Sequence, residues 1–464
     1  MIRNGKKKAI SCALVAAMSV GLAACGTTSY DFKVSYDGIK TGDVSSKVSV
    51  HDPSILKADG EYYIFGSHMS AAKSSDLLNW EKVADGYSKK NPVYGQIYDV
   101  ADKAFAYSGS KNSLIKTDDK QVHVWAPDVI YNETTGLYYM YYCTTSTWNA
   151  SNLCYGTSTT PEGPYEWQGA LIYSGFNRKT ISGTDVLDYV DEDYAYKNYI
   201  KGAQYNYEDY PNAIDPTVFY DADGRMWMVY GSWSGGIFLL EIDKTTGLVI
   251  HPEADEANNV DPYYGKRLLG GGHISIEGPY IMYDEASGYY YLFVSYGALT
   301  SNGGYQVRVF RSKTVDGDYV DMNGKYPEKS AQHQNFGLKL TGNYKLPSLE
   351  KAYMATGHNS AFVDDDGRMY LVYHTRFNDN GEGHSPRVHQ MLVNEDGWPC
   401  ELPYQTQGET VNKDGYDADD IIGRYYVINQ GTAIDSKIAN PVILYLEKNG
   451  KVKGEKSEGT WECK

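Results

Sequence analysis

The chain has 464 residues and a formal net charge of −16 at neutral pH, and Tyr alone contributes 45 residues. Such a negative surface repels nucleic acids, anionic lipid and polyanionic substrates, so it suits a neutral partner. Tyr-rich runs and turn dipeptides recur while long helical periodicities are absent, which predicts an all-β protein.

The N-terminus is typical of an export signal. Basic residues up to Lys8 precede an apolar run over 9–24 that is short for a permanent membrane span. The run ends in Leu22-Ala23-Ala24-Cys25-Gly26, which resembles the lipobox of bacterial lipoproteins. We therefore expect 1–24 to be removed, Cys25 to carry a lipid anchor, and 25–47 to form a tether. An ordinary signal peptide with a chance cysteine is the alternative.

A three-part phrase recurs five times after the tether. A short polar motif is followed by a turn containing Gly and then by a Tyr-rich strand. The Tyr-rich parts are Glu61-Tyr62-Tyr63-Ile64-Phe65, Leu137-Tyr138-Tyr139-Met140-Tyr141, Met226-Trp227-Met228-Val229-Tyr230, Tyr289-Tyr290-Tyr291-Leu292-Phe293 and Met369-Tyr370-Leu371-Val372-Tyr373. Five copies predict a five-bladed β-propeller over 48–403, with loops inserted in its blades.

The heads of the five phrases bring together residues that are far apart in the sequence. In a propeller, the innermost strand of each blade begins at one mouth of the central channel. The heads contain Asp52, Asp128, Asp215, Glu277 and His358. Crowding acids in one place costs stability and shifts their protonation equilibria, so the ring indicates chemistry rather than turn formation.

Six ordered motifs extend this pattern. They are Val50-His51-Asp52-Pro53-Ser54, His123-Val124-Trp125-Ala126-Pro127-Asp128, Asn212-Ala213-Ile214-Asp215-Pro216, Ile276-Glu277-Gly278-Pro279-Tyr280, Gly357-His358-Asn359-Ser360 and Arg387-Val388-His389-Gln390-Met391. With them the chain resembles glycoside hydrolase family 43 from about 48 to about 403, and within it the endo-α-1,5-L-arabinanases. The resemblance implies hydrolysis of internal bonds in arabinan.

The resemblance also implies roles for three carboxylates. Asp52 is expected to be the general base that deprotonates water, and Glu277 the general acid that protonates the leaving oxygen. Asp215 is expected to orient Glu277 and to favour its protonated form. The family inverts the anomeric carbon, for which the base and the acid stand roughly 6.5 to 9.5 Å apart with a water between them.

A calcium ion and several substrate contacts follow from the same resemblance. His358 is expected to bind calcium, with water completing the shell, or else to be a neutral His hydrogen-bonded to the carboxylates. His51 and Arg376 are expected at the catalytic subsite, with packing of the blade as the alternative. Trp125, Trp148 and Trp233 are predicted stacking platforms, with packing as the alternative. Asp128 either contacts substrate or braces the second blade.

The remaining segments leave alternatives open. The loop 183–210 either walls the cleft or is a solvated insertion. Residues 404–464 resemble part of a small C-terminal β domain, which may be incomplete. Cys143, Cys154, Cys400 and Cys463 match no metal motif, and a disulfide among them is possible but not required. The chain is expected to be a monomer. An exo-acting arabinofuranosidase, a β-xylosidase and a non-catalytic glycan-binding lipoprotein are the rival functions.

Overall fold

A computed structural model describes residues 29–37, 46–109, 123–145, 150–327, 332–412 and 414–463. Cys25 and Trp148 lie outside these residues. The prediction of an all-β protein is confirmed, because the helices are few and short. They are α1 Gly95–Asp99, α2 Ala101–Ala104, α3 Val186–Tyr189, α4 Glu192–Asn198 and α5 Ala418–Ile421, with 3-10 turns η1 Ser67–Met69, η2 Ile181–Gly183, η3 Glu256–Asn258 and η4 His333–Asn335. No helix of the described residues is long and apolar enough to cross a membrane.

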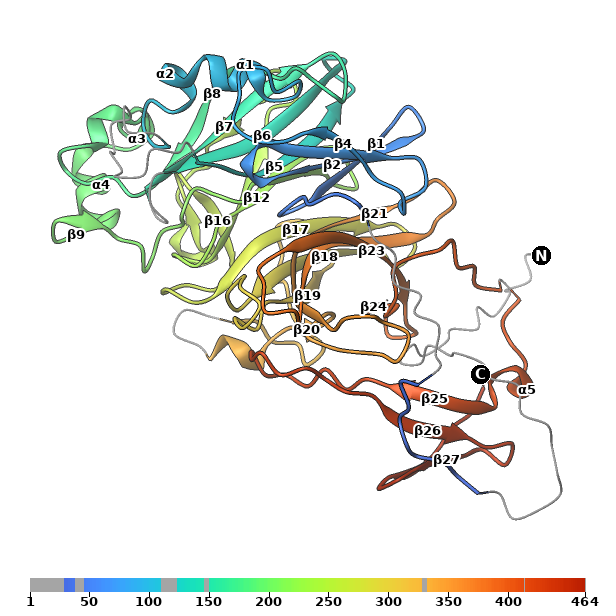
Figure 1. Ribbon diagram of the computed structural model, residues 1–464. Coiled ribbons are helices and arrows are strands. Elements are labelled where there is room, and N and C mark those ends of the chain that lie inside the picture. Colours follow the sequence, from blue (N-terminus) through green and yellow to red (C-terminus); the bar gives the residue numbers. More distant parts are fainter. Residues whose placement is uncertain are drawn as a thin grey trace, which may run out of the picture.

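Five antiparallel sheets, each continuous in sequence, account for most of the chain (Figure 1). The first contains β1 Ser54–Ala58, β2 Glu61–Gly66, β3 Ser70–Ser74 and β4 Glu81–Ala84. The second contains β5 His123–Asn132, β6 Leu137–Thr145, β7 Ser151–Ser158 and β8 Glu166–Tyr173. The third contains β11 Thr217–Tyr220, β12 Met226–Tyr230, β13 Ile237–Ile242, β14 Val249–Ile250, β15 Val260–Asp261 and β16 Gly265–Leu269. The fourth contains β17 Ile276–Asp284, β18 Tyr289–Tyr296, β19 Gln306–Ser312 and β20 Leu338–Lys339. The fifth contains β21 Tyr353–Val363, β22 Met369–Phe377, β23 His384–Val393 and β24 Pro399–Glu401.

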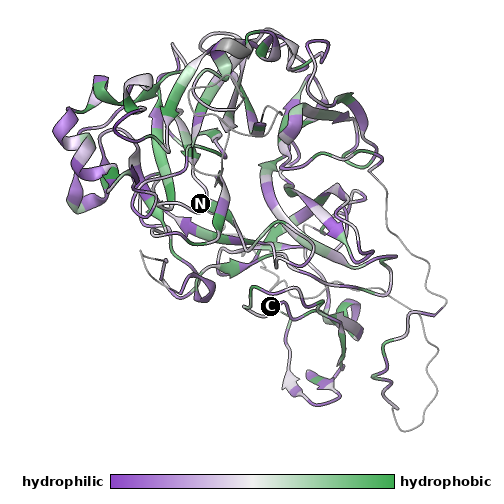
Figure 2. Ribbon diagram, turned by 60° about the vertical axis from the view of Figure 1, so that its left-hand side comes forward, coloured by the Kyte–Doolittle hydropathy of each residue, from purple (hydrophilic) through white to green (hydrophobic). Residues whose placement is uncertain are grey.

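The first strands of the five sheets form a closed ring. β1 contacts β5, β5 contacts β11, β11 contacts β17, β17 contacts β21, and β21 contacts β1. Apolar side chains fill the space between neighbouring sheets, including the first and the last, where Ile55 and Ile64 share a core with Val372 and Val388. In Figure 2 the hydrophobic colour is concentrated on the strands of these sheets. The ring places the beginnings of five distant strands beside one another.

The predicted Asp-Gly turn is present where the first hairpin reverses. Ala58 pairs with Glu61, so Asp59 and Gly60 alone connect β1 to β2. Both have positive φ, 53° and 80°. Two consecutive residues of positive φ make the turn whose twist matches that of the flanking strands, which explains why Asp-Gly stands at this point in the sequence.

The insertion before β11 is partly helical. It contains α3, α4 and a two-stranded ribbon of β9 Ile200–Lys201 and β10 Gln204–Tyr205. Asp261 anchors it, because its Oδ1 accepts a hydrogen bond from the Tyr199 hydroxyl at 2.8 Å. Tyr199 is fully buried in the core between the second and third sheets. This part of the insertion is therefore packed against the ring rather than solvated on all sides.

A separate four-stranded sheet follows the ring, with β25 Gly423–Val427, β26 Val442–Leu446, β27 Lys451–Gly454 and β28 Glu458–Thr460. The described part of the expected tether packs against it. The Tyr445 hydroxyl donates to the Asp31 carbonyl at 2.8 Å, and the Tyr445 ring lies 5.1 Å from that of Tyr30. The expectation of a tether is therefore wrong for these residues, since their aromatic side chains find a partner sheet. Cys143, Cys154, Cys400 and Cys463 are all free.

Candidate active site

Each of the five sheets has a residue in the left-handed region at the same place in the ring, either in its innermost strand or just before it. These residues are Asp52, Ala126, Asp215, Gly278 and His358, with φ between 42° and 55°. Non-glycine residues rarely adopt this conformation, and where they do the strain is often associated with function. The strand pairing of β5, β17 and β21 shifts register at these residues. The five kinks bring the phrase heads together.

The sequence predicted equivalent positions for the five residues at the phrase heads, and the kinks show that Asp128 and Glu277 do not occupy them. In the second sheet the kinked residue is Ala126, and Asp128 lies two residues beyond it. In the fourth sheet it is Gly278, and Glu277 lies one residue before it. Asp52, Asp215 and His358 occupy equivalent positions in three sheets, whereas Glu277 approaches from a neighbouring position.

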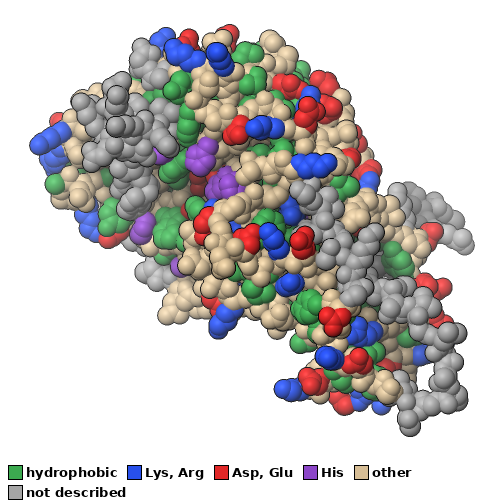
Figure 3. All heavy atoms as spheres, viewed as in Figure 1, with side chains coloured by type: hydrophobic (Ala, Val, Ile, Leu, Met, Phe, Trp, Pro, Cys, Tyr) green, Lys and Arg blue, Asp and Glu red, His purple; other side chains and the backbone are tan. Residues whose placement is uncertain are grey.

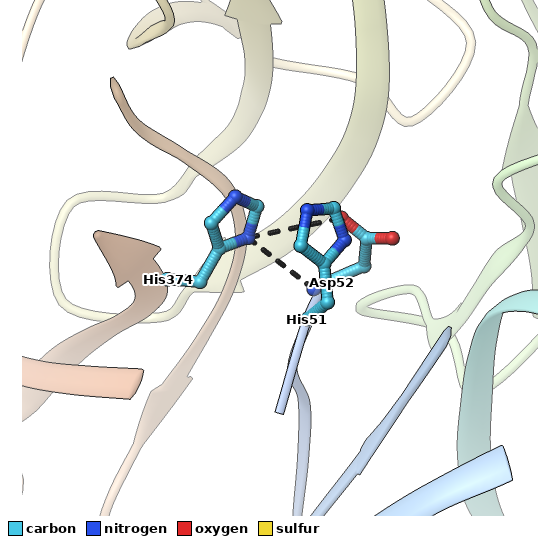
Figure 4. A group of neighbouring side chains, drawn as sticks. All are labelled: His51, Asp52 and His374. Carbon is cyan, nitrogen blue, oxygen red and sulfur yellow. Dashed lines mark hydrogen bonds and ion pairs between the residues drawn. The ribbon is translucent and has the colours of Figure 1, made fainter. Parts of the chain in front are cut away.

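Asp52 is surrounded by three imidazoles, two of which, those of His51 and His374, are drawn in Figure 4. Its Oδ1 lies 2.8 Å from Nδ1 of His51, 3.1 Å from Nδ1 of His358 and 3.7 Å from Nδ1 of His374. Its Oδ2 accepts a hydrogen bond from the Ser67 hydroxyl. The Asp52 backbone N–H donates to Nδ1 of His374 at 3.3 Å. Both oxygens and the main chain of Asp52 are thereby fixed.

These neighbours keep Asp52 ionised. Burial alone would raise its pKa, but His358, His51 and His374, together with the hydrogen bond from His51, hold the pKa of this carboxyl well below its usual value. Burial lowers the pKa of His374 well below its usual value, and the Asp52 carboxylate offsets part of this effect. An ionised, buried carboxylate with fixed geometry can act as a base toward a water molecule.

Glu277 accepts hydrogen bonds at both carboxylate oxygens. The Tyr305 hydroxyl donates to Oε1 at 2.6 Å. The Trp233 indole N–H donates to Oε2 at 2.6 Å, and the Ser232 hydroxyl donates to the same atom at 3.3 Å. The donors come from the fourth sheet and from the segment after β12, so the carboxyl group is held from two sides.

The surroundings of Asp215 disfavour the charged form of its carboxyl group. Burial, followed by the charges of Glu277 and Asp52, raises the pKa of Asp215 well above its usual value. The Gly278 backbone N–H donates to Oδ2 at 3.2 Å and offsets only part of this effect. The two acids at equivalent kinks, Asp52 and Asp215, therefore differ in protonation, which general acid–base chemistry requires of neighbouring carboxyl groups.

His358 lies against Gly278. A Cβ atom at residue 278 would lie 3.0 Å from Nδ1 of His358, and the φ of Gly278 is 55°. The His358 backbone N–H donates to the Ser295 hydroxyl oxygen at 2.7 Å. The Glu-Gly-Pro motif thus needs glycine at its centre. A side chain there is disfavoured both by the positive φ and by the close contact with the His358 ring.

Calcium is the cofactor that the resemblance implies at His358. The protein groups nearest to it are imidazoles and one carboxylate, not a cage of oxygen ligands. The adjacent Asn359 is buried, and neither polar atom of its amide has a hydrogen-bond partner among the described residues. Ordered water satisfies buried polar atoms of this kind. The residues therefore fit a calcium ion whose ligands are mostly water, with His358 as the protein ligand.

The predicted substrate contacts differ in their surroundings. The ring of His51 stacks on that of His374 at 4.0 Å. Arg376 is buried, and its guanidinium donates to the main-chain oxygens of Leu299 and Glu382 and lies 3.4 Å from Nε2 of His51. Arg376 is thus bound to protein groups and lies beside His51, which favours packing within the blade over a contact with substrate.

Asp128 braces the ring rather than contacting substrate. It is 2% exposed, accepts a hydrogen bond from the Ser54 hydroxyl, and accepts another from the Val218 N–H at 2.6 Å. These contacts join the first three sheets. Burial raises the pKa of Asp128 to about 7. Of the two roles expected for Asp128, these contacts favour the brace, because they place its carboxyl group between the sheets.

Of the three predicted stacking platforms, Trp125 and Trp233 lie among the described residues, and both are partly exposed. Trp125 packs against the core between the second and third sheets, 5.4 Å from the ring of His123. Trp233 lies 5.4 Å from the ring of His273, and its indole binds Glu277. Their role as stacking platforms remains a prediction. Figure 3 shows several His side chains close together on one face of the molecule.

Sequence reasoning missed Ser67, His374 and Tyr305. The Ser67 hydroxyl, besides binding Asp52, accepts a hydrogen bond from the Ala126 N–H at 2.9 Å, which links the kinks of the first two sheets. His374 lies in β22 directly after the last Tyr-rich run, and the sequence Tyr373-His374 at a phrase end was a usable signal. Ser67 and Tyr305 stand at no phrase head and had none.

Comparison with known proteins identifies the family. The sequence model of glycosyl hydrolases family 43 matches residues 44–208 and 191–399. The chain belongs to this family. A second model, that of a C-terminal lipocalin-like domain found with family 43, matches residues 403–464. The resemblance inferred from the six motifs is confirmed.

Relatives with assigned activities extend along most of the chain. An extracellular endo-α-(1→5)-L-arabinanase of Thermotoga petrophila is 39% identical over 428 residues, covering 89% of this chain and 83% of that protein. Extracellular endo-α-(1→5)-L-arabinanase 2 of Bacillus subtilis is 36% identical, covering 90% and 83%. The crystal structure of the Thermotoga petrophila endo-1,5-α-L-arabinanase superposes with a TM-score of 0.75 at 38% identity, covering 91% of this chain and 88% of that one.

Proposed function

We propose that this family 43 glycosidase hydrolyses internal α-1,5-L-arabinofuranosidic bonds of arabinan with inversion of the anomeric carbon. The observation that carries the proposal is the pairing of an ionised Asp52, held by three imidazoles, with a Glu277 held by three donors in the same ring. Relatives at 36–39% identity are named endo-arabinanases.

In this proposal Asp52 takes the proton of the attacking water, and Glu277 gives a proton to the leaving oxygen. Asp215 keeps Glu277 oriented through the Gly278 N–H, which it binds at 3.2 Å next to Glu277 in the chain. Burial and the charge of Glu277 raise the pKa of Asp215, so the two neighbouring carboxyl groups resist being ionised together. The three acids thus perform different tasks because their surroundings differ.

The fold that we propose for the ring is a five-bladed β-propeller spanning 48–403, followed by a C-terminal β domain over 404–464. Five sheets that are continuous in sequence, with first strands in contact around a closed circle, support it.

An endo-acting enzyme is favoured over an exo-acting one. The two relatives with 39% and 36% identity are both named endo-arabinanases, whereas an extracellular exo-α-(1→5)-L-arabinofuranosidase of Cellvibrio japonicus shares 27%. An exo-1,5-α-L-arabinanase from a bovine ruminal metagenomic library superposes with a TM-score of only 0.53. The negative charge of the chain carries no electrostatic penalty against a neutral polymer.

We further propose that calcium binds at His358, that the protein is exported and lipid-anchored through Cys25, and that it acts as a monomer. The two endo-arabinanase relatives are named extracellular, which supports export. The buried amide of Asn359 beside His358 supports a hydrated ion.

A time course on linear arabinan, read by chromatography, tests the function. Early products should be a ladder of oligosaccharides, and the new anomeric centre should first appear inverted. Arabinose as the sole first product would instead indicate exo action. Release of xylose from xylo-oligosaccharides without action on arabinan would move the substrate elsewhere. Binding to polysaccharides without any cleavage would indicate a glycan-binding lipoprotein.

A further inference from the structure

Tyr305 connects the Glu277 carboxyl group to residues of the fifth sheet. Its hydroxyl donates to Oε1 of Glu277 at 2.6 Å, and the residue is 1% exposed. Its ring stacks on that of His374 at 5.9 Å. It also lies flat on Gly357, where a Cβ atom would come within 2.3 Å of the ring. The ring is therefore clamped by the fifth sheet, while its hydroxyl reaches an acid of the fourth.

The residues on either side of Tyr305, Gly304 and Gln306, contact the C-terminal β domain. Residues 430–435, here called the strap, lie between β25 and β26 and reach back to the ring near β20 (Figure 1). The Gln306 amide donates to the carbonyls of Gly304 at 2.9 Å and of Ala433, in the strap, at 3.1 Å. A Cβ atom at Gly304 would lie 2.7 Å from the Asp435 backbone nitrogen. The strap thus flanks Tyr305 on its N-terminal side.

A buried arginine completes this support. Arg308 is 1% exposed, and no carboxylate pairs with it among the described residues. Its Nε and Nη2 donate to the Gln306 amide oxygen at 3.2 and 3.1 Å, and Nη2 also donates to the Thr432 carbonyl. Its Nη1 donates to the carbonyls of Gln334 and Phe336, each at 2.8 Å. All five N–H donors are used, so Arg308 fixes the rotamer of Gln306.

We propose that Tyr305 is a positioning residue for the acid Glu277, and that the strap holds Tyr305 in place through Gln306 and Arg308. This inference rests on the proposed function. The Trp233 indole holds the other oxygen of the same carboxyl group, so the Tyr305 hydroxyl fixes the rotation of Glu277 about its last bond. A proton donor that is misdirected by even 1 Å loses much of its rate advantage.

The test compares two substrates that differ in their need for a proton. An arabino-oligosaccharide has an alkoxide leaving group that must be protonated, whereas its dinitrophenyl glycoside releases a stable phenolate. Tyr305→Phe should lower kcat on the oligosaccharide about 10- to 100-fold with little change in KM, and on the dinitrophenyl glycoside less than about threefold. Tyr319→Phe removes another fully buried hydroxyl, which binds the Val315 carbonyl at 2.9 Å, and should change neither.

Equal losses on both substrates, or wild-type kcat on both, would overturn the role of Tyr305. A wild-type protein that cleaves neither would instead refute the proposed function. For the strap, Gln306→Leu should reproduce the pattern of Tyr305→Phe in weaker form. Lys339→Met removes contacts of 3.1 Å to the same strap, at Gln430 and Ala433, without touching Gly304, and should leave kcat within about twofold. A loss in Lys339→Met that equals the loss in Gln306→Leu would overturn the route through Gln306.

Discussion

Nδ1 of His358 lies 3.1 Å from Oδ1 of Asp52, so the last sheet of the ring touches the proposed base of the first. His358 also packs against Gly278, which follows the proposed acid in the chain. The His358 imidazole therefore contacts both the proposed base Asp52 and the residue that follows the proposed acid Glu277. This contact explains why residues separated by about 300 positions in sequence can act together, and why changes at His358 should affect activity more than folding.

Asp52→Asn should lower turnover of arabinan about 10²- to 10⁴-fold, because the amide cannot take a proton from water. Folding should be retained, since an amide still accepts the Ser67 hydrogen bond. Reducing-end release and thermal melting would be measured together. Asp223→Asn, an exposed acid in the β11–β12 turn, is the control and should keep full activity. A variant of Asp52 with near-normal turnover would remove it from the role of base.

His358→Ala should weaken calcium retention and lower activity well beyond any loss of stability. Metal content after dialysis and activity before and after chelation would be compared with those of His251→Ala, whose ring packs between Tyr189 and Tyr263 away from the carboxylates. Wild-type enzyme that stays fully active after complete removal of calcium would refute the calcium proposal and leave the carboxylate roles standing.

The repeat in the sequence was informative because propeller-like symmetry converts equal positions into neighbours. It predicted that Asp52, Asp215, Glu277 and His358 would converge, and the structure brings their surroundings into contact. It failed for Asp128, because the kink at Ala126 shifts the register of β5 and turns the side chain into the interface between sheets. A local backbone feature of this kind is not visible in residue types.

Tyr305 and the strap were unpredictable for a different reason. Tyr305 follows a glycine-rich loop rather than a phrase head, and its partner Glu277 lies 28 residues away on another strand. Residues 430–435 read as an ordinary connection of the C-terminal domain. Their contacts with Gln306 and Arg308 depend on how two domains pack, which local periodicity does not encode.

Asp215→Asn should stabilise the protein while reducing its activity. Since the folded-state pKa is raised above the ordinary value of 3.8, the contribution of Asp215 to stability is fully present below pH 3.8 and is lost as pH rises through the folded-state pKa. The amide removes this loss, so unfolding free energy at neutral pH should rise by about 0.5–2 kcal/mol, with the gain vanishing toward pH 3.8. Denaturant unfolding at several pH values would measure it, and a gain that is independent of pH would contradict the explanation.

Gly278→Ala should cost both stability and activity. The new methyl group would press on the His358 ring and require a strained φ of 55°, which together cost about 1–3 kcal/mol. Gly60→Ala is the matched control, because Gly60 also has positive φ but no atom within 4 Å of a new Cβ. Melting temperatures and kcat of both variants separate backbone strain from the contact with His358. Equal effects in both would show that the contact does not matter.

Cys25→Ser should release the enzyme from the membrane fraction. The sequence Leu22-Ala23-Ala24-Cys25 closes an apolar leader, and acylation of that cysteine is the attachment that the motif implies. A single acyl chain binds membranes weakly and reversibly, whereas two chains anchor a protein stably, so loss of the acceptor should be almost complete rather than partial. Cys463→Ser makes the same chemical change at an exposed cysteine near the other end and should leave the protein in the membrane fraction. Fatty-acid labelling should mark the wild type and Cys463→Ser but not Cys25→Ser. Label that persists in Cys25→Ser, or a wild type that is already free in the medium, would favour an ordinary signal peptide.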